Sequence, residues 1–185
     1  MELSEAIRGR RATRQFAQTP VAKPALLELI DAAIQAPSAI NAQPWEFTVI
    51  QNRTHLDRIA ASSKAYMLTA MEHSAAPQHL RDLLKNPDFD IFYHAPALIV
   101  ISAKSGDWAV EDAALAAQNL MLAAYAKGLG TCWIGFAQRW LETDEGKRSI
   151  ELPPGIQPVA PIIVGYPAGP MPPVPRNQPR VRWFD

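Results

Sequence analysis

An apolar run followed by an apolar helix constrains the fold of this chain most strongly. Residues 92–102 include a continuous stretch of aliphatic side chains, which is typical of a strand that is buried on both faces. Residues 108–127 would be apolar almost all round as a helix, which is typical of a helix inside a core. Along the chain, helices alternate with few strands, and we therefore expect one α+β domain.

Periodic segments on either side supply the other elements. Leu26, Ile30 and neighbouring apolar residues recur at helical spacing and predict a helix over residues 19–36. Residues 45–50 alternate in polarity, which predicts a half-buried strand. Residues 72–90 have weak periodicity and fit either a lid over a pocket or an ordinary surface connection. The other expected elements are helices over 1–9 and 54–71, a turn into a strand over 128–136, a polar helix-turn segment over 137–152 and a strand over 158–166.

Length, charge and cysteine content limit the function classes. The 185 residues suit one domain spanning residues 1–185, and the formal net charge of zero gives no general attraction to nucleic acid or an anionic membrane. The single cysteine, Cys132, excludes an intramolecular disulfide and fits a reducing compartment. Neither a signal peptide nor an apolar segment of membrane-spanning length is visible, so we expect a cytoplasmic protein. The histidines lack the spacing of metal ligands, so no metal site is expected.

A cluster of arginines near the N-terminus points to an anion. Arg8, Arg10, Arg11 and Arg14 fall within seven positions, which we call the arginine segment (residues 8–14). Guanidinium groups present planar forks of donors that match phosphate oxygens. The alternative is a solvated basic turn. An arm that binds nucleic acid is disfavoured, because the cluster is short and contains no interleaved aromatic residues.

A polar turn separates the predicted helix at 19–36 from the strand at 45–50. Pro37 cannot donate to a helical ladder, and Ser38, Asn41 and Gln43 follow it. An amide presents a donor and an acceptor on one planar edge, which suits the edge of a flat heterocycle or a chain of hydroxyl groups. The alternative is that these side chains satisfy the polar groups of their own turn.

The sequence Gly-Leu-Gly-Thr-Cys-Trp-Ile-Gly at 128–135 ends the apolar helix and turns into a strand. It is no dinucleotide fingerprint, because the third glycine is misplaced and the order is helix then strand. Gly130 and Gly135 would let the backbone approach a flat group, with Trp133 and Ile134 beside it. The alternative is a buried strand with a glycine bulge, and Cys132 then fits a small core residue better than a nucleophile.

The C-terminal arm, residues 167–185, is rich in proline and predicts an extended segment. Its last residues include Val181, Trp183 and Phe184, which are apolar groups available for burial against a partner. The many alanines of the helix at 108–127 would allow the close approach of a second chain, although close packing within one chain explains them equally well.

Together these motifs resemble the nitroreductase family of FMN-dependent oxidoreductases over the whole chain. The resemblance rests on Arg-Arg-Ala-Thr-Arg-Gln-Phe at 10–16, Ala-Pro-Ser-Ala-Ile-Asn-Ala-Gln-Pro-Trp-Glu-Phe at 36–47, Ala-Pro at 95–96, Gly-Leu-Gly-Thr-Cys-Trp-Ile-Gly at 128–135 and Pro-Arg at 175–176. It implies an α+β fold with a mostly antiparallel or mixed sheet. It also implies an intertwined homodimer with two FMN sites at the interface, in which the C-terminal arm embraces the partner.

The resemblance also implies roles for individual residues, all of them in binding the cofactor. The phosphate and ribityl chain would be held by Arg10, Arg11, the backbone of Ala12, Arg14 and Arg176; the partner subunit would contribute Pro37, Ser38, Asn41 and Gln43; and the isoalloxazine would be lined by Trp133, Ile134 and Gly135. Two departures from the family pattern are expected to weaken the binding of the phosphate. Ala12 stands where a serine is frequent, and Asn177 stands where a second basic residue is frequent.

The implied function is transfer of a hydride from NAD(P)H to FMN, followed by ping-pong reduction of a nitroaromatic, a quinone or a similar flat acceptor. No catalytic side chain is expected, because the flavin carries the chemistry. One alternative is a specialised flavin reaction on the same fold, such as enone reduction, dehalogenation, azoline oxidation or flavin breakdown. Another alternative is a protein that binds FMN or another phosphorylated ligand without turnover.

Overall fold

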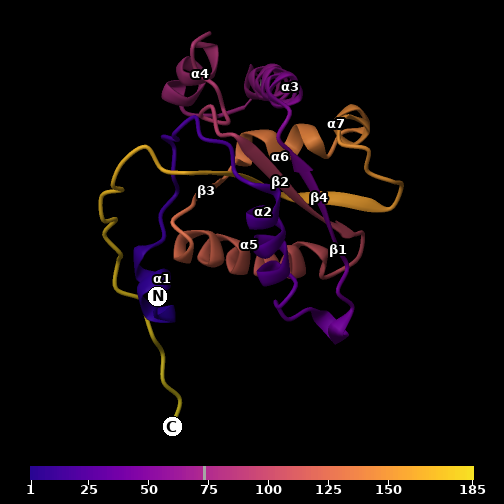
Figure 1. Ribbon diagram of the computed structural model, residues 1–185. Coiled ribbons are helices and arrows are strands. Elements are labelled where there is room, and N and C mark those ends of the chain that lie inside the picture. The colour runs from indigo at the N-terminus through magenta and orange to yellow at the C-terminus, as the bar shows by residue number, and fades with distance from the viewer. Residues whose placement is uncertain (73) are drawn as a thin grey trace.

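An antiparallel sheet forms the centre of the molecule (Figure 1). The computed structural model describes residues 1–72 and 74–185, so His73 lies outside the described residues. The strands are β1 (Trp45–Ile50), β2 (Ala97–Lys104), β3 (Gly130–Trp133) and β4 (Ile156–Gly165). Their order in the sheet is β1-β2-β4-β3, and each pair of neighbours is antiparallel. This arrangement confirms the expected α+β fold.

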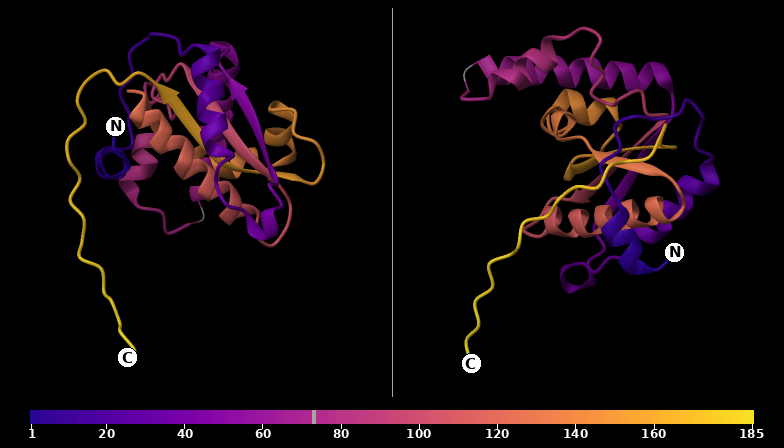
Figure 2. Two further views of the ribbon diagram at one scale, coloured as in Figure 1. Left: turned by 60° about the horizontal axis from the view of Figure 1, so that its bottom comes forward. Right: turned by 90° about the vertical axis from the view of Figure 1, so that its left-hand side faces the viewer.

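Helices cover both faces of the sheet, as Figure 2 shows. One core joins α3 and α6 to one face of the sheet, and a second core joins α2 and α5 to the other face. The helices are α1 (Leu3–Gly9), α2 (Lys23–Ala33), α3 (Arg53–Glu72), α4 (Gln78–Lys85), α5 (Ala109–Ala126), α6 (Gly135–Leu141) and α7 (Asp144–Ser149), with a short 3₁₀ helix η1 (Ala39–Asn41). Within the part of the chain that the structure describes, no helix combines the length and the hydropathy needed to cross a membrane.

The strand β2 is buried on both faces, which explains why its apolar residues do not alternate with polar ones. Its successive side chains point to opposite faces. Leu98 and Val100 enter the core on the side of α3, whereas Ile99 and Ile101 enter the core on the side of α5. All four side chains are fully buried. The expected burial on both faces is therefore confirmed.

The helix α5 uses its alanines to pack closely within the chain. Ala113, Ala116 and Ala117 are fully buried against the sheet and α2. Leu115, by contrast, is 46% exposed on the same helix, and Val110 is also exposed. Packing within the chain therefore accounts for part of the alanine content, and an apolar part of α5 still faces outward.

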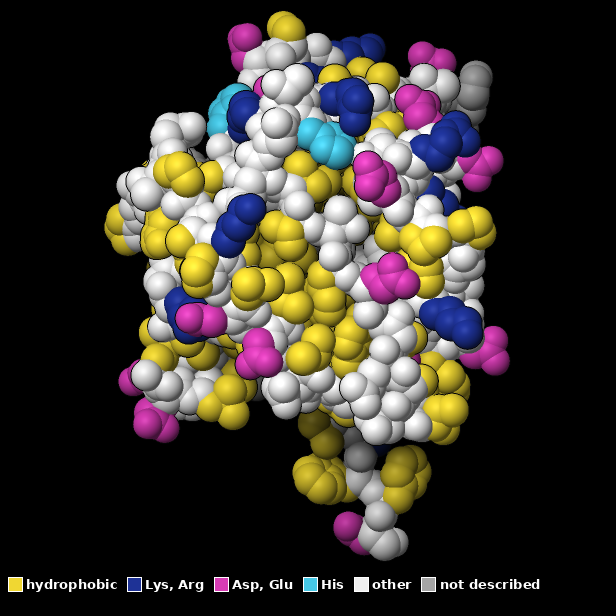
Figure 3. Space-filling model, turned by 45° about the vertical axis from the view of Figure 1, so that its right-hand side comes forward, with side chains coloured by type: hydrophobic (Ala, Val, Ile, Leu, Met, Phe, Trp, Pro, Cys, Tyr) yellow, Lys and Arg dark blue, Asp and Glu magenta, His cyan; other side chains and the backbone are white. Residues whose placement is uncertain are grey.

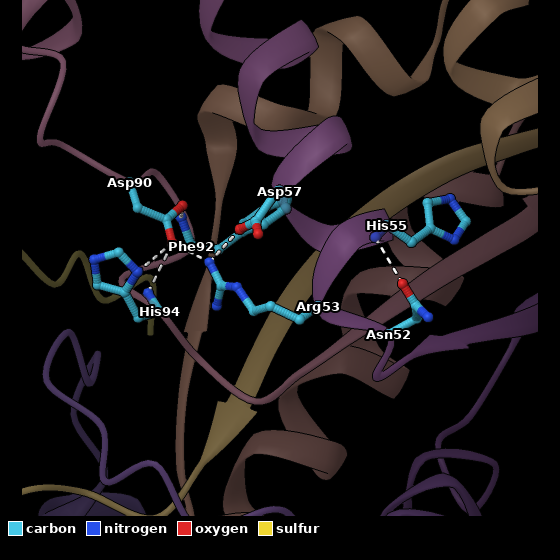
Figure 4. Close-up of polar contacts among 7 residues, drawn as sticks. All are labelled: Asn52, Arg53, His55, Asp57, Asp90, Phe92 and His94. Carbon is cyan, nitrogen blue, oxygen red and sulfur yellow. Dashed lines mark hydrogen bonds and ion pairs between the residues drawn. The ribbon is translucent and has the colours of Figure 1, made fainter.

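The entry to β2 differs from the expectation of a strand over 92–102. Asp90 folds the preceding residues into a turn, because its Oδ1 accepts the N–H of Phe92 at 2.9 Å and its Oδ2 accepts the N–H of His94 at 2.9 Å. Arg53 of α3 pairs with Asp90 at 3.1 Å and also with Asp57, and His94 lies 3.2 Å from Asp90 (Figure 4). The strand therefore begins only at Ala97.

Other parts of the chain also differ from the expectation. The helix expected over 19–36 begins only at Lys23, with Pro24 in its first turn where a missing N–H costs little, and it ends at Ala33. The weakly periodic segment 72–90 contains α4, which was not predicted as a helix. The strand expected within residues 128–136 ends early, because Gly135, the last glycine of the 128–135 motif, is the first residue of α6.

The arginine segment docks directly on β3. Ala12 and Thr131 form a parallel bridge, and the N–H of Thr13 donates to the carbonyl of Thr131 at 2.9 Å. A Cβ atom on Gly130 would lie 2.4 Å from Oγ1 of Thr13, so only glycine fits this approach. The close neighbour of Gly130 is thus the arginine segment itself, and not the flat ligand that the sequence suggested.

We expect Gly130→Ala to destabilise the protein by about 1–3 kcal/mol, because the new methyl group overlaps a Thr13 side chain whose backbone is bonded to β3. Urea unfolding monitored by circular dichroism measures this loss. Gly106→Ala is the matched control, since a Cβ atom there would have its nearest protein neighbour, the carbonyl of Lys104, at 4.0 Å. Equal midpoints for the two variants would contradict the close packing of the arginine segment on β3.

Candidate functional site

A cavity of about 550 Å³ lies where the arginine segment, β3 and α6 meet the end of α3. We call it the Arg14 cavity. It brings together four residues that the sequence assigned to one site, namely Arg14, Trp133, Ile134 and Gly135. Its other lining residues are Met67, Ala70, Met71, Ser74, Ala76, Ile91, Tyr93, Cys132, Phe136 and Arg139. Ser74 and Ala76 belong to the segment 72–90, so this segment covers part of the cavity.

Backbone and side-chain bonds hold the wall formed by β3 and α6. The N–H of Ile134 donates to the carbonyl of Pro161 in β4 at 2.8 Å. The indole N–H of Trp133 donates to Oε1 of Gln138 in α6 at 3.3 Å, which orients the ring. A Cβ atom on Gly135 would meet no protein atom within 4 Å. The wall is therefore ordered, and it opens at Gly135 onto free space.

The described charged side chains that line the Arg14 cavity are all basic. Its lining includes two arginines, Arg14 and Arg139, and none of its described lining residues is Asp or Glu. Burial raises the pKa of the Tyr93 hydroxyl, and the nearby Arg14 acts in the opposite direction. Burial likewise raises the pKa of the Cys132 thiol against the effect of Arg14 and Arg10. A protonated, buried thiol is a poor nucleophile, which agrees with the interpretation of Cys132 as a core residue.

The turn set by Asp90 provides the Tyr93 wall of the same cavity. Tyr93 and His94 both have positive φ angles, of 53° and 55°, a backbone conformation that is uncommon for residues other than glycine. Asp90 supplies those bonds at the backbone, as Figure 4 shows. The ion pair of Arg53 with Asp90 thereby ties the start of α3 to the wall that carries Tyr93.

Arg10 and Arg11 lie next to the Arg14 cavity, and each has an N–H group without an acceptor among the described residues. They line a small cavity of about 40 Å³ with Tyr125 of α5 and the start of the C-terminal arm. Arg11 donates through Nη1 to the carbonyls of Arg8 and Arg10, the latter at 2.8 Å. The Nε atoms of Arg10 and Arg11 are buried, and no described residue accepts from them. Buried donors without an acceptor fit an anion such as a phosphate group.

The turn over residues 37–43 is strained and satisfies many of its own polar groups. Ile40, Asn41 and Gln43 have φ angles of 50°, 56° and 47°, a region that Asn tolerates but that Ile and Gln rarely adopt. The N–H of Gln43 donates to Oγ of Ser38 at 2.9 Å, and the Gln43 amide donates to Oδ1 of Asn41 at 3.1 Å. The hypothesis of a self-satisfied turn thus describes these bonds correctly.

A buried carboxylate anchors this turn to the core. Asp112, in the first turn of α5, accepts the N–H of Ala39 at 2.9 Å and is only 4% exposed. The same turn leaves Ile40 at its tip 99% exposed. A strained turn with an exposed apolar tip and a buried anchor has the features of a binding element.

The two groups of predicted site residues lie at opposite ends of α5 (Figure 1). Asp112 holds the 37–43 turn near the start of the helix, whereas Tyr125 borders the arginine segment near its end. At about 1.5 Å rise per residue, these two positions are about 20 Å apart along the axis. Within one chain the structure therefore does not bring Pro37, Ser38, Asn41 and Gln43 into the Arg14 cavity.

Arg176 makes no contact with the arginine segment through a hydrogen bond or an ion pair of the described residues. It belongs to the exposed C-terminal arm, and no hydrogen bond or ion pair among the described residues includes it. The start of the arm is fixed, because the N–H of Ala168 donates to the carbonyl of Gln15 at 3.0 Å. The predicted contact of Arg176 with a phosphate group stays a prediction.

Several residues of the site escaped the sequence analysis. Tyr93 was assigned to a strand, and Asp90, two positions before Phe92, is the signal for a turn that was missed. Arg139 was placed in a polar helix-turn segment, although its spacing of three from Phe136 puts both on one side of a helix. Asp112 gave no signal, since its partner is a backbone N–H far away in sequence.

Among the described residues no cluster of three or more His, Cys, Asp or Glu side chains could hold a metal ion.

Comparison with known proteins matches the Nitroreductase family model to residues 7–166. A protein of Methanothermobacter thermautotrophicus named "Putative NADH dehydrogenase/NAD(P)H nitroreductase" is 30% identical over 174 residues, which covers 91% of this chain and 78% of the relative. An iodotyrosine deiodinase of Thermotoga neapolitana is 30% identical over 182 residues, covering 94% and 93% of the two chains. The crystal structure of a nitroreductase with bound FMN from Bacteroides fragilis has a TM-score of 0.85 and 24% identity, with 100% of both chains covered. The chain belongs to the nitroreductase family.

Proposed function

We propose that this protein binds FMN and catalyses transfer of electrons from NAD(P)H to a flat acceptor such as a nitroaromatic or a quinone. The observation that carries the proposal is the Arg14 cavity, in which a cation borders an ordered wall of Trp133, Ile134 and Gly135. The bound FMN of the Bacteroides fragilis nitroreductase and the name of the Methanothermobacter thermautotrophicus relative support it.

The residues of the cavity suit FMN in two ways. The buried Nε donors of Arg10 and Arg11, together with Arg14, would bind the phosphate and the ribityl chain. Trp133, Ile134 and Gly135 would lie along the isoalloxazine, and the open space at Gly135 would let the backbone approach it. When bound, FMN supplies the two-electron redox chemistry, and the side chains bind and orient it and exclude water.

A second chain would complete each site. The 37–43 turn lies about 20 Å along α5 from the arginine segment, and none of its residues lines the Arg14 cavity of its own chain. We propose a homodimer in which Pro37, Ser38, Asn41 and Gln43 contact the FMN that the other chain holds. The exposed Ile40 at the tip of the turn, and Val110 and Leu115 on the outer side of α5, supply apolar surface for such contact.

The C-terminal arm supports the same assembly. It ends in Trp183 and Phe184, which are 83% and 93% exposed. On the opposite edge of the sheet, a hollow of about 550 Å³ with a largely apolar lining runs along the edge strand β1 (Figure 3). Leu26, Leu27, Ile30, Val49, Ile50 and Ile150 are among its lining residues. We propose that the arm of the partner covers this hollow, because Leu27 and Val49 in the lining are exposed apolar residues, as are Trp183 and Phe184 of the arm.

A specialised flavin reaction is the second candidate. The Thermotoga neapolitana relative is named an iodotyrosine deiodinase, and the match covers 94% of this chain. Reductive dehalogenation would use the same cofactor site. The two candidates differ in the electron donor and in the acceptor.

Anaerobic titration of the FMN-loaded protein tests the proposed function. We expect NADH or NADPH to bleach the flavin absorbance, and a nitroaromatic or a quinone then to restore it, because the flavin accepts electrons in one half-reaction and passes them on in the next. A protein that takes up no FMN would contradict the proposal. Bound flavin that neither nucleotide reduces would favour a specialised reaction or a binding protein without turnover.

The double variant Arg11→Ala, Arg14→Ala tests the phosphate assignment. We expect its affinity for FMN to fall at least about 100-fold, because two charged donors are lost. Quenching of flavin fluorescence measures the affinity, and thermal unfolding checks that the fold persists. The matched control is Arg58→Ala, Arg148→Ala, which removes two exposed arginines outside the Arg14 cavity. Unchanged affinity in the first variant would refute the assignment.

Asp112→Ala tests whether the 37–43 turn serves FMN. Loss of the carboxylate leaves the N–H of Ala39 without its acceptor, and we expect the affinity for FMN to fall about tenfold. Asp112→Asn keeps an oxygen acceptor at the same place and should retain most of the affinity. If Asp112→Ala binds FMN as tightly as the wild type does, the turn has no part in the site.

A further inference from the structure

Two cations border the Arg14 cavity, and they stand in different surroundings. Arg14 lies beside the Tyr93 hydroxyl and Cys132, among the residues that would hold FMN. Arg139 comes from α6, three residues after Phe136, and both of these side chains line the cavity. The bond from Trp133 to Gln138 fixes α6 against β3, so Arg139 stands on an ordered element.

Arg139 has no assigned partner within its own chain. Among the described residues no hydrogen bond or ion pair involves its guanidinium group, which is exposed. No carboxylate lines the cavity to neutralise it, and most of its neighbours there are apolar, including Met67, Ala70 and Phe136. A cation that borders a cavity without any carboxylate in its described lining attracts an anion.

We propose that Arg139 is a specificity-determining residue that binds the anionic group of a substrate entering the Arg14 cavity. The substrate class is a flat molecule that carries a carboxylate or a phosphate at one end. Its flat part lies against the flavin, and its anionic group pairs with the guanidinium fork. This inference rests on the proposed function, because it places the flavin in the same cavity.

The anionic group has two possible sources. It belongs either to the acceptor, as the carboxylate of an aromatic acid, or to the nucleotide, as the additional phosphate of NADPH. The shared chemistry is an oxyanion at the cavity mouth. Separate measurements with acceptors and with nucleotides distinguish the two sources.

The first measurement uses binding alone, so it does not depend on turnover. The FMN-loaded protein is titrated with 4-nitrobenzoate and with nitrobenzene, and the change in the flavin spectrum gives the two dissociation constants. We expect tighter binding of 4-nitrobenzoate in the wild type, and we expect Arg139→Gln to reduce this preference about five- to tenfold. Arg139→Lys should restore part of it, because the charge returns without the planar fork.

The second measurement compares kcat/KM for NADPH and NADH in the same proteins. A NADPH preference that falls in Arg139→Gln would assign the anionic group to the nucleotide. Arg148→Gln, which removes an exposed arginine of α7 outside the cavity, is the matched control and should leave both ratios unchanged. If Arg139→Gln changes neither the acceptor ratio nor the nucleotide ratio in a protein that binds FMN, the inference is wrong. A wild-type protein that binds no FMN would instead refute the proposed function.

Discussion

The candidate site depends on the docking of the arginine segment against β3. A backbone bond from Thr13 to Thr131, at 2.9 Å, joins the arginine segment to the edge strand β3. Gly130 permits this approach, because any side chain there would overlap Thr13. The docking places Arg14 in the same cavity as Trp133 and leaves the donors of its neighbouring arginines buried and available. A segment of like charges is thus held in place by its backbone and by glycine packing, and the Nε donors of Arg10 and Arg11 have no acceptor among the described residues.

The long helix α5 sets the geometry of the rest. Its buried alanines bring the sheet and α2 close, and its two ends support different parts of the site. At one end Asp112 anchors the strained 37–43 turn, and at the other end Tyr125 borders Arg10 and Arg11. A rigid helix between them prevents the two parts from meeting within one chain. Two copies in opposite orientation would bring the 37–43 turn of one chain to the arginine segment of the other, which is the physical reason for proposing a homodimer.

Sequence patterns predicted the elements whose packing is local. The strand β1 was predicted with the bounds that it has, since alternation over residues 45–50 reports its half-buried position directly. The turn at Asp90 was missed because a side-chain acceptor decides it. The helix α4 was missed because it has only eight residues, although Leu80, Leu83 and Leu84 recur in it at helical spacing. The contact of Gly130 with Thr13 was also beyond reach, as it joins residues distant in sequence. For the site, motif spacing identified Arg14 and the 133–135 wall, whereas Arg139 and Asp112 became visible only in three dimensions.

The central claim is that one flavin site is built from two chains, and subunit complementation tests it most directly. One chain carries Arg11→Ala and Arg14→Ala, the other carries Asp112→Ala, and the mixed species is purified through two different tags after co-expression. A site shared between chains gives the mixed dimer one intact site, so we expect about one tightly bound FMN per two chains, although each variant alone binds FMN weakly. If both parts of the site belonged to one chain, every site in the mixture would carry a defect. Weak FMN binding in the mixed species would therefore contradict the account.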